Sequence, residues 1–139
     1  MADFRERVMA ARREELEAYE KYSELAAIAP THELSLLIQS IARDELGHAR
    51  ILSGMLGMED DIDSLTVRAQ ERRRMPDSGR FRRMVARIID DELNAVSAYA
   101  QLAIIAPELE QRLLFLTVVA DEFGHARTFI AILNPSRGD

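Results

Sequence analysis

Asp-Glu-Leu-Gly-His-Ala-Arg occupies residues 44–50, and Asp-Glu-Phe-Gly-His-Ala-Arg occupies residues 121–127. The two stretches lie 77 positions apart, and at this offset residues 13–50 align without a gap with residues 90–127. In this alignment 18 of 38 pairs are identical, including Glu, Tyr, Pro and the Glu-x-x-His motif. Two helices can share apolar periodicity by chance, but they would not share these residue types at one constant offset. The sequence is therefore an internal duplication.

Each repeat predicts two helices joined by a turn at proline. Apolar residues recur at spacings of three and four, which is the pattern of a helix with one buried face. Pro30 and Pro107 lack an N–H and disfavour helix in the preceding residue, so we expect the chain to turn there. The expected helices run from about Asp3 to Ala29, from there to the region of Gly54 and Gly57, from about Ser78 to Ala106, and from Pro107 to Asn134-Pro135. The second and fourth are expected to bury the stripes Leu34, Leu37, Ile41, Glu45, His48, Leu52, Met55 and Leu114, Val118, Glu122, His125, Phe129, Ile132.

The short turns predict two antiparallel hairpins, at about residues 3–57 and 78–134. Residues 58–77 connect them and are long enough to run the length of a helix of about 40 Å, with room for a short helix near Leu65–Arg74. Two helical hairpins joined by one long crossover have the ferritin-like topology. The expected fold class is therefore all-α, a ferritin-like four-helix bundle that forms a single domain over residues 1–139.

Composition excludes several classes of site and partner. The 139 residues include no cysteine, which excludes disulfides, zinc–thiolate sites, iron–sulfur clusters and a rubredoxin-type centre within them. The net charge of −6 argues against a nucleic-acid surface, and the arginines at 72–74 and 80–87 are better explained as a solvated face or linker. Met1–Arg7 is rich in charge and no apolar run approaches membrane length. We therefore expect a soluble, cytoplasmic protein with neither a membrane nor a nucleic-acid partner.

Six polar residues fall on the stripes that are expected to be buried: Glu15, Glu45, His48, Glu92, Glu122 and His125. Glu45 and His48 are three residues apart and leave the same face of one helix, while Glu15 holds the matching position on the other helix of the hairpin. The second repeat copies this arrangement. Four carboxylates buried together are unfavourable, because desolvation and mutual repulsion both oppose ionisation. Two divalent cations would neutralise them and use the imidazoles as further donors, so the pattern predicts a two-metal site with these six ligands.

A single Glu-x-x-His is usually a surface pair, but two copies on apolar stripes, each with a further glutamate on the partner helix, favour the metal site. Mixed carboxylate and imidazole ligands favour iron or manganese, rank zinc below them and disfavour copper. A site with open coordination positions can bind dioxygen or peroxide. His32, whose repeat partner is Leu109, is expected to be a solvated residue near a helix start and not a ligand.

The repeated Glu, followed by Asp-Glu-(Leu/Phe)-Gly-His-Ala-Arg, resembles the rubrerythrins and ferritin-like di-iron proteins, over nearly the whole chain outside the crossover. The resemblance implies two iron ions, one held by Glu15 with His48 and one by the matching pair of the second repeat, Glu92 with His125. It also implies that Glu45 and Glu122 bridge the two ions.

The resemblance implies further roles beside the ligands. Tyr22 and Tyr99 lie seven residues after Glu15 and Glu92 and would donate hydrogen bonds to the carboxylates; core tyrosines bonded elsewhere are the alternative. Asp44 and Asp121 would each accept the outer N–H of a ligand histidine, that of the opposite hairpin. Plain acids on a helix surface are the alternative for this pair.

Two departures from the rubrerythrin pattern bear on function. Rubrerythrins proper add a rubredoxin domain, so here the electrons must come from a separate donor such as rubredoxin or a reductase. They also carry an extra glutamate one turn after the third-helix ligand, where this chain has Ala95. That glutamate takes part in the iron movement associated with peroxide reduction in the family, so Ala95 puts peroxidase activity in question.

The first hypothesis for the function is a di-iron oxidoreductase that reacts with peroxide or dioxygen. The alternatives are a ferroxidase for iron storage, a di-metal oxygenase, and a metal-stabilised bundle with only a binding or structural role. We also expect a homo-oligomer, a dimer or larger.

Overall fold

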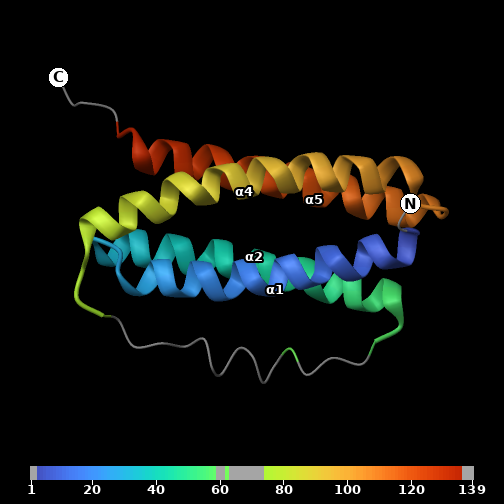
Figure 1. Ribbon diagram of the computed structural model, residues 1–139, viewed down its shortest axis with the longest axis horizontal. Helices are drawn as coiled ribbons and strands as arrows, with labels where there is room; N and C mark the ends of the chain where they lie inside the picture. The colour runs from blue at the N-terminus through green and yellow to red at the C-terminus, as the bar shows by residue number, and fades with distance from the viewer. Residues whose placement is uncertain (1–2, 59–61, 63–73, 136–139) are drawn as a thin grey trace. The chain divides into compact units, whose positions relative to one another are not determined.

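The computed structural model describes residues 3–58, 62 and 74–135. Within them the regular elements are four helices, α1 (Phe4–Ala27), α2 (His32–Leu56), α4 (Ser78–Ile105) and α5 (Leu109–Leu133), labelled in Figure 1. The chain divides into two compact units, Met1–Ser78 and Gly79–Asp139. The predicted all-α class with two helical hairpins is confirmed. The short helix expected near Leu65–Arg74 and most of the crossover lie outside the described residues, and the single domain over 1–139 stays a prediction.

The first hairpin begins and turns at residues that cap helices. Asp3 precedes α1, and its carboxylate accepts a hydrogen bond from the Glu6 N–H at 2.8 Å. After the predicted turn at Pro30, Thr31 caps α2 in the same way, with its Oγ1 accepting from the Leu34 N–H at 3.2 Å. Such side-chain oxygens satisfy amide groups that the first helical turn leaves without partners. Both helices therefore start at defined residues.

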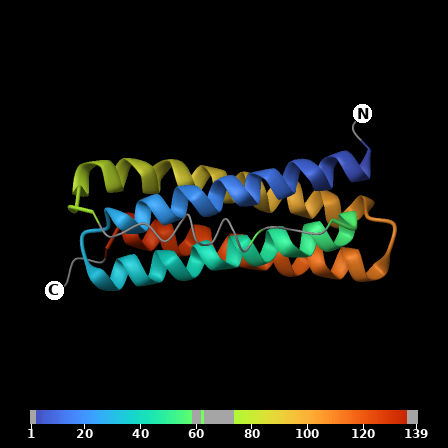
Figure 2. The ribbon, with the colours of Figure 1, turned by 90° about the horizontal axis from the view of Figure 1, so that it is seen from below.

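Polar contacts at both ends hold α1 and α2 side by side and antiparallel, as Figures 1 and 2 show. Near the turn the hydroxyl of Ser35 donates to the Ala26 carbonyl at 2.8 Å. Toward the other end Arg12 Nε donates to Ser53 Oγ at 2.7 Å. α2 then ends at Gly57, whose φ of 67° lies in the left-handed region that favours glycine.

The second hairpin has the same plan with different contacts. Arg112 Nε donates to the Ala106 carbonyl at 2.7 Å, across the turn at Pro107. The rings of Tyr99 and Phe115 pack in a tilted arrangement with centroids 6.1 Å apart, which joins α4 to α5. Figure 2 shows these two helices running antiparallel in the yellow-to-red part of the chain.

The predicted buried stripes are wrong in the second turns of α2 and α5. Leu37 and Leu114 are 41% and 38% exposed, whereas the next residues, Ile38 and Phe115, are fully buried. At about 100° per residue, position 38 lies roughly 20° around the helix from Glu45, and position 37 lies roughly 80° away. The prediction is wrong by one residue in both repeats, because an eight-residue spacing from the ligand glutamate was expected and the buried residue lies seven residues before it.

None of the described helices combines the length and the apolar character that a membrane span requires.

Candidate metal centre

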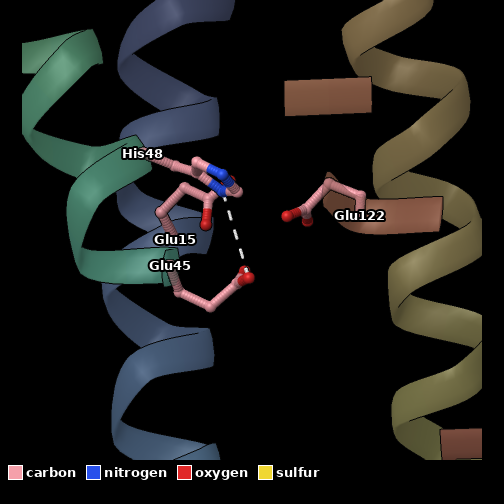
Figure 3. Close-up of side chains that lie close together, drawn as sticks. All are labelled: Glu15, Glu45, His48 and Glu122. Atoms are coloured by element: carbon pink, nitrogen blue, oxygen red, sulfur yellow. Dashed lines mark ion pairs between the residues drawn. The ribbon is translucent and has the colours of Figure 1, made fainter. Parts of the chain in front are cut away.

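The first hairpin brings three of the predicted ligands together. Glu15 projects from α1, and Glu45 and His48 project from neighbouring turns of α2, so that the three side chains converge in Figure 3. His48 Nδ1 lies 3.5 Å from Glu15 Oε1 and 3.9 Å from Glu45 Oε1. All three residues are buried, with exposed fractions of 1–4%. We call these three residues the first half-site.

The second hairpin repeats the geometry. Glu92 comes from α4, and Glu122 and His125 come from α5. His125 Nδ1 lies 3.6 Å from Glu92 Oε1 and 3.5 Å from Glu122 Oε1, and the three residues are again buried. In both hairpins one donor atom of each of the three residues lies within 4.8 Å of the others. We call Glu92, Glu122 and His125 the second half-site.

These distances fit donors that share an ion better than they fit hydrogen bonds. A charge-assisted N–H···O bond is about 2.7–2.9 Å long, which is shorter than each of the four Nδ1–Oε1 distances given above. Two donors that each lie about 2.1 Å from one metal ion, at an angle of about 110–120°, are about 3.4–3.6 Å apart. The shorter distances in each half-site match that separation.

Charge points to the same conclusion. Each half-site buries two carboxyl groups and one imidazole. A protonated histidine could offset at most one of the two carboxylate charges, which leaves an unbalanced buried charge. One divalent cation per half-site balances both carboxylates and leaves the imidazole neutral, as a metal donor must be. The donor set present in each hairpin therefore fits one divalent ion of the kind bound by oxygen and imidazole ligands.

The local sequence explains why these side chains point inward. Val8, Ala11 and Tyr22 are buried on the same stripe of α1 as Glu15, four or seven residues from it. Burying those neighbours forces the intervening glutamate to the same side. Its burial is thus imposed by the helix, at a cost that a bound cation would offset.

The other predicted site residues divide into buried and exposed pairs. Tyr22 and Tyr99 are 2% and 3% exposed, two helical turns after the first glutamate of each half-site. Asp44 and Asp121 are exposed. The roles that the resemblance implies for these four residues stay predictions, as do the ligand roles of the half-site residues. His32 is the first residue of α2 and is exposed, as expected of a solvated residue.

One buried phenol was not singled out by sequence reasoning. Tyr19 is 6% exposed and lies one turn after Glu15 on α1. The same position in the second repeat is Val96, so the second repeat has no phenol at this position. The spacing of four residues from Glu15 was the signal that could have revealed it.

A family model described as Rubrerythrin matches residues 6–133, which include both half-sites. Neither a curated protein nor a solved structure matches the chain. The family match and the four described helices confirm the predicted fold class, an all-α ferritin-like four-helix bundle.

Proposed function

Because this chain belongs to the rubrerythrin family, we propose that its two half-sites together hold two iron ions, and that the protein is a di-iron oxidoreductase that reacts with peroxide or dioxygen. The observation that carries the proposal is the buried set of two glutamates and one histidine, present once in each hairpin with nearly the same distances. Manganese has the same ligand preferences and is the second choice of metal.

The residues of the chain have different roles in this proposal. Glu15 with His48 holds one ion, and Glu92 with His125 holds the other. Glu45 and Glu122 serve both ions, because each carboxylate has two oxygens and can bridge. Two bound iron ions can supply two electrons by passing from the ferrous to the ferric state, which is the number needed to reduce one peroxide molecule to water.

The protein surroundings favour a small oxidant. The half-site residues are at most 6% exposed, so burial limits which molecules reach them. Peroxide and dioxygen are small molecules and therefore suit a buried site.

The phenols of Tyr22 and Tyr99 have a positioning role in this proposal. Each is buried two turns from the first glutamate of its half-site, where its O–H can donate to a carboxylate oxygen. Such a bond holds the carboxylate in one orientation and gives the site a proton next to the ligand shell. The 139 residues contain no cysteine, so an iron–thiolate electron donor must lie outside them.

A ferroxidase is the second candidate, and Ala95 is the observation that favours it. This residue is half-buried and lies three positions after Glu92, where rubrerythrins carry the extra glutamate linked to iron movement and peroxide reduction. Without that carboxylate the site has one ligand fewer to capture a moving ion. A protein that oxidises Fe(II) with dioxygen needs no such movement.

Anaerobic loading with Fe(II), followed by stopped-flow mixing with peroxide or with dioxygen, tests the proposal. We expect two iron ions per chain and single-turnover oxidation by at least one of the two oxidants. Faster oxidation by peroxide supports the peroxidase, whereas faster oxidation by dioxygen, with ferric iron accumulating beyond two per chain, supports the ferroxidase. Failure to bind iron, or ferrous iron that resists both oxidants, overturns the proposed function.

The test variant replaces Glu122 by Gln, which keeps the size of the side chain and removes its charge, and a matched change at Glu110 is its control. The Glu122→Gln variant should lose coupled two-ion binding and rapid oxidation. Glu110 lies on the same helix and is exposed, so Glu110→Gln should behave as the wild type.

A further inference from the structure

A second apolar stripe runs along α5. Positions 109, 113, 116, 120, 123, 127 and 130 alternate in spacing between four and three, the a/d pattern of a helix that packs lengthwise on another helix. All seven positions are exposed. Five of them are large apolar side chains with exposed fractions between 43% and 63%: Leu109, Leu113, Leu116, Phe123 and Ile130. We call the seven positions the outer seam.

The outer seam lies on a different side of α5 from its half-site residues. At about 100° per residue it is centred roughly 130° around the helix from Glu122. The opposite face is already buried, with Phe115, Val118 and Phe129 beside the half-site. A helix that is apolar on both faces is normally covered on both. Something should therefore cover the outer seam.

The internal duplication supplies a control for this interpretation. The α2 residues at the same repeat positions are His32, Leu36, Gln39, Arg43, Leu46, Arg50 and Ser53. Of these, only Leu36 is an exposed large apolar residue, because Leu46 is 3% exposed and the others are polar. The two helices thus share the residues of the half-sites and differ in the outer seam. Helix formation alone does not require an apolar residue at these positions.

The two hairpins also differ at one pair of positions where the first hairpin has a hydrogen bond between its helices. In the first hairpin Arg12 donates to Ser53 at 2.7 Å. The same two repeat positions in the second hairpin are Ile89 and Ile130, so a hydrogen-bonded pair is replaced by two aliphatic residues. Ile130 is 43% exposed. The change toward apolar side chains therefore affects both α4 and α5.

We propose that the outer seam is the interface between two copies of this chain, packed antiparallel through α5 about a two-fold axis at Ala120. With this register Leu116 faces Phe123 of the second copy, and Leu109 faces Ile130 of the second copy. Ala120 meets its own counterpart at the axis, where a small side chain allows two helices to approach closely. The seam is then complementary to itself, as a two-fold interface must be.

Charge selects the antiparallel arrangement over the parallel one. Arg127 is the single charged residue of the outer seam. In a parallel pair it would face Arg127 of the second copy, and such a pair of like charges is unfavourable. In the antiparallel pair it lies opposite Leu113 of the second copy and one turn from Glu110 of the second copy. Its aliphatic stem can cover the leucine while its guanidinium reaches the carboxylate.

The area of the outer seam is adequate for a dimer. A fully exposed large apolar side chain presents roughly 200 Å², so the five exposed fractions amount to about 500 Å² of apolar surface per copy. Two copies would bury about 1,000 Å² from these side chains alone, and the flanking residues of α5 would add to it. Stable interfaces bury about 1,200–2,000 Å² in total.

The first test measures mass with a variant designed from the repeat. Leu116→Gln, Ala120→Arg and Ile130→Ser together give α5 the residues that α2 has at the same positions. By native mass spectrometry and light scattering we expect wild type at about twice 15.8 kDa and the triple variant at the monomer mass, with a dimer dissociation constant raised at least about a hundredfold.

Controls separate the interface from folding and from the proposed function. Leu36→Glu and Leu113→Glu change equivalent repeat positions with similar exposed fractions, 51% and 54%, and only Leu113→Glu should weaken the dimer. Helical content by circular dichroism and Mn(II) binding should be retained by all variants. A monomeric wild type, or a folded triple variant that stays dimeric, overturns the proposal.

The second test determines the register. The chain has no cysteine, so each introduced thiol is unique. Ala120→Cys should cross-link between copies with a short bismaleimide, whereas Arg43→Cys, at the same repeat position on α2, should not. Leu113→Cys mixed with Arg127→Cys should give a cross-linked heterodimer. Cross-linking of each of these two variants with itself, and not with the other, indicates a parallel pair and refutes the proposed arrangement.

Discussion

Replacing Glu45 by Gln should remove most of the metal-dependent stability of the protein and stabilise the metal-free form. Glu45 is 1% exposed and its Oε1 lies 3.9 Å from His48 Nδ1, so the substitution removes a buried charge without leaving a cavity. In the proposed site this carboxylate serves both ions. Its loss should therefore weaken both ions, whereas loss of Glu15 should weaken one.

The magnitude follows from the two half-sites. An ion present at about a thousandfold excess over its dissociation constant stabilises the folded state by about 4 kcal/mol, so two ions contribute about 8 kcal/mol. At about 3 °C per kcal/mol for a domain of this size, the melting temperature of the wild type should rise by roughly 25 °C. For Glu45→Gln we expect a rise of at most about 6 °C. Without metal the variant should melt a few degrees above the wild type, because one of two buried like charges is gone.

The assay is thermal unfolding by circular dichroism, with and without excess Mn(II) as a stand-in for Fe(II) that resists oxidation in air. Glu20→Gln is the control, because Glu20 is exposed on α1 and such substitutions change stability by about 0.5 kcal/mol or less. A wild-type melting temperature that ignores Mn(II), or a Glu45→Gln variant with the full metal-induced rise, would refute the reasoning.

Three further predictions address binding, rate and electron supply. Mn(II) affinity should fall as the pH is lowered from 8 to 5, because protons compete for the imidazoles and carboxylates; calorimetry in two buffers should detect proton release on binding, and a pH-independent affinity would contradict this. Tyr22→Phe and Tyr99→Phe should leave the metal count at two per chain and slow iron oxidation about tenfold in stopped-flow traces, an effect that unchanged rates in both variants would disprove. Purified protein given NADH and peroxide should show no sustained turnover until rubredoxin or a reductase is added, and NADH consumption without either would mean that the protein accepts electrons directly from NADH.

The helix ends could be predicted because the residues that determine them act locally. Pro30 and Pro107 exclude helix at the turns, and Gly57 adopts a positive φ at the end of α2. The observed helices agree with the expected ends to within about two residues. The buried stripes were harder, since a spacing of three and a spacing of four fit equally well when they are counted from a distant anchor. Ile38 and Phe115 were missed for that reason.

The convergence of Glu15, Glu45 and His48 could be predicted because a hairpin and two helical periods determine it. The imidazole atom that faces the carboxylates could not, because Nδ1 and Nε2 are chosen by side-chain rotation, which residue spacing does not encode. The outer seam was also missed. Because α5 has apolar residues on two faces, its sequence shows no single helical period. The two stripes are distinguished only by the exposed fractions of residues such as Leu116.

The positions of the two half-sites along the chain have a consequence for metal loading during protein synthesis. All donors of the first half-site lie within residues 15–48, so they are synthesised before any donor of the second half-site, which begins at Glu92. In the proposed site one divalent ion balances the two carboxylates of that hairpin, so the hairpin would have the donors to take up metal while translation continues. If the half-sites hold metal as proposed, loading would proceed in two stages along the chain. A shortage of metal during synthesis would leave the nascent hairpin with two uncompensated glutamates in its core, and would expose it to proteases before its other half exists.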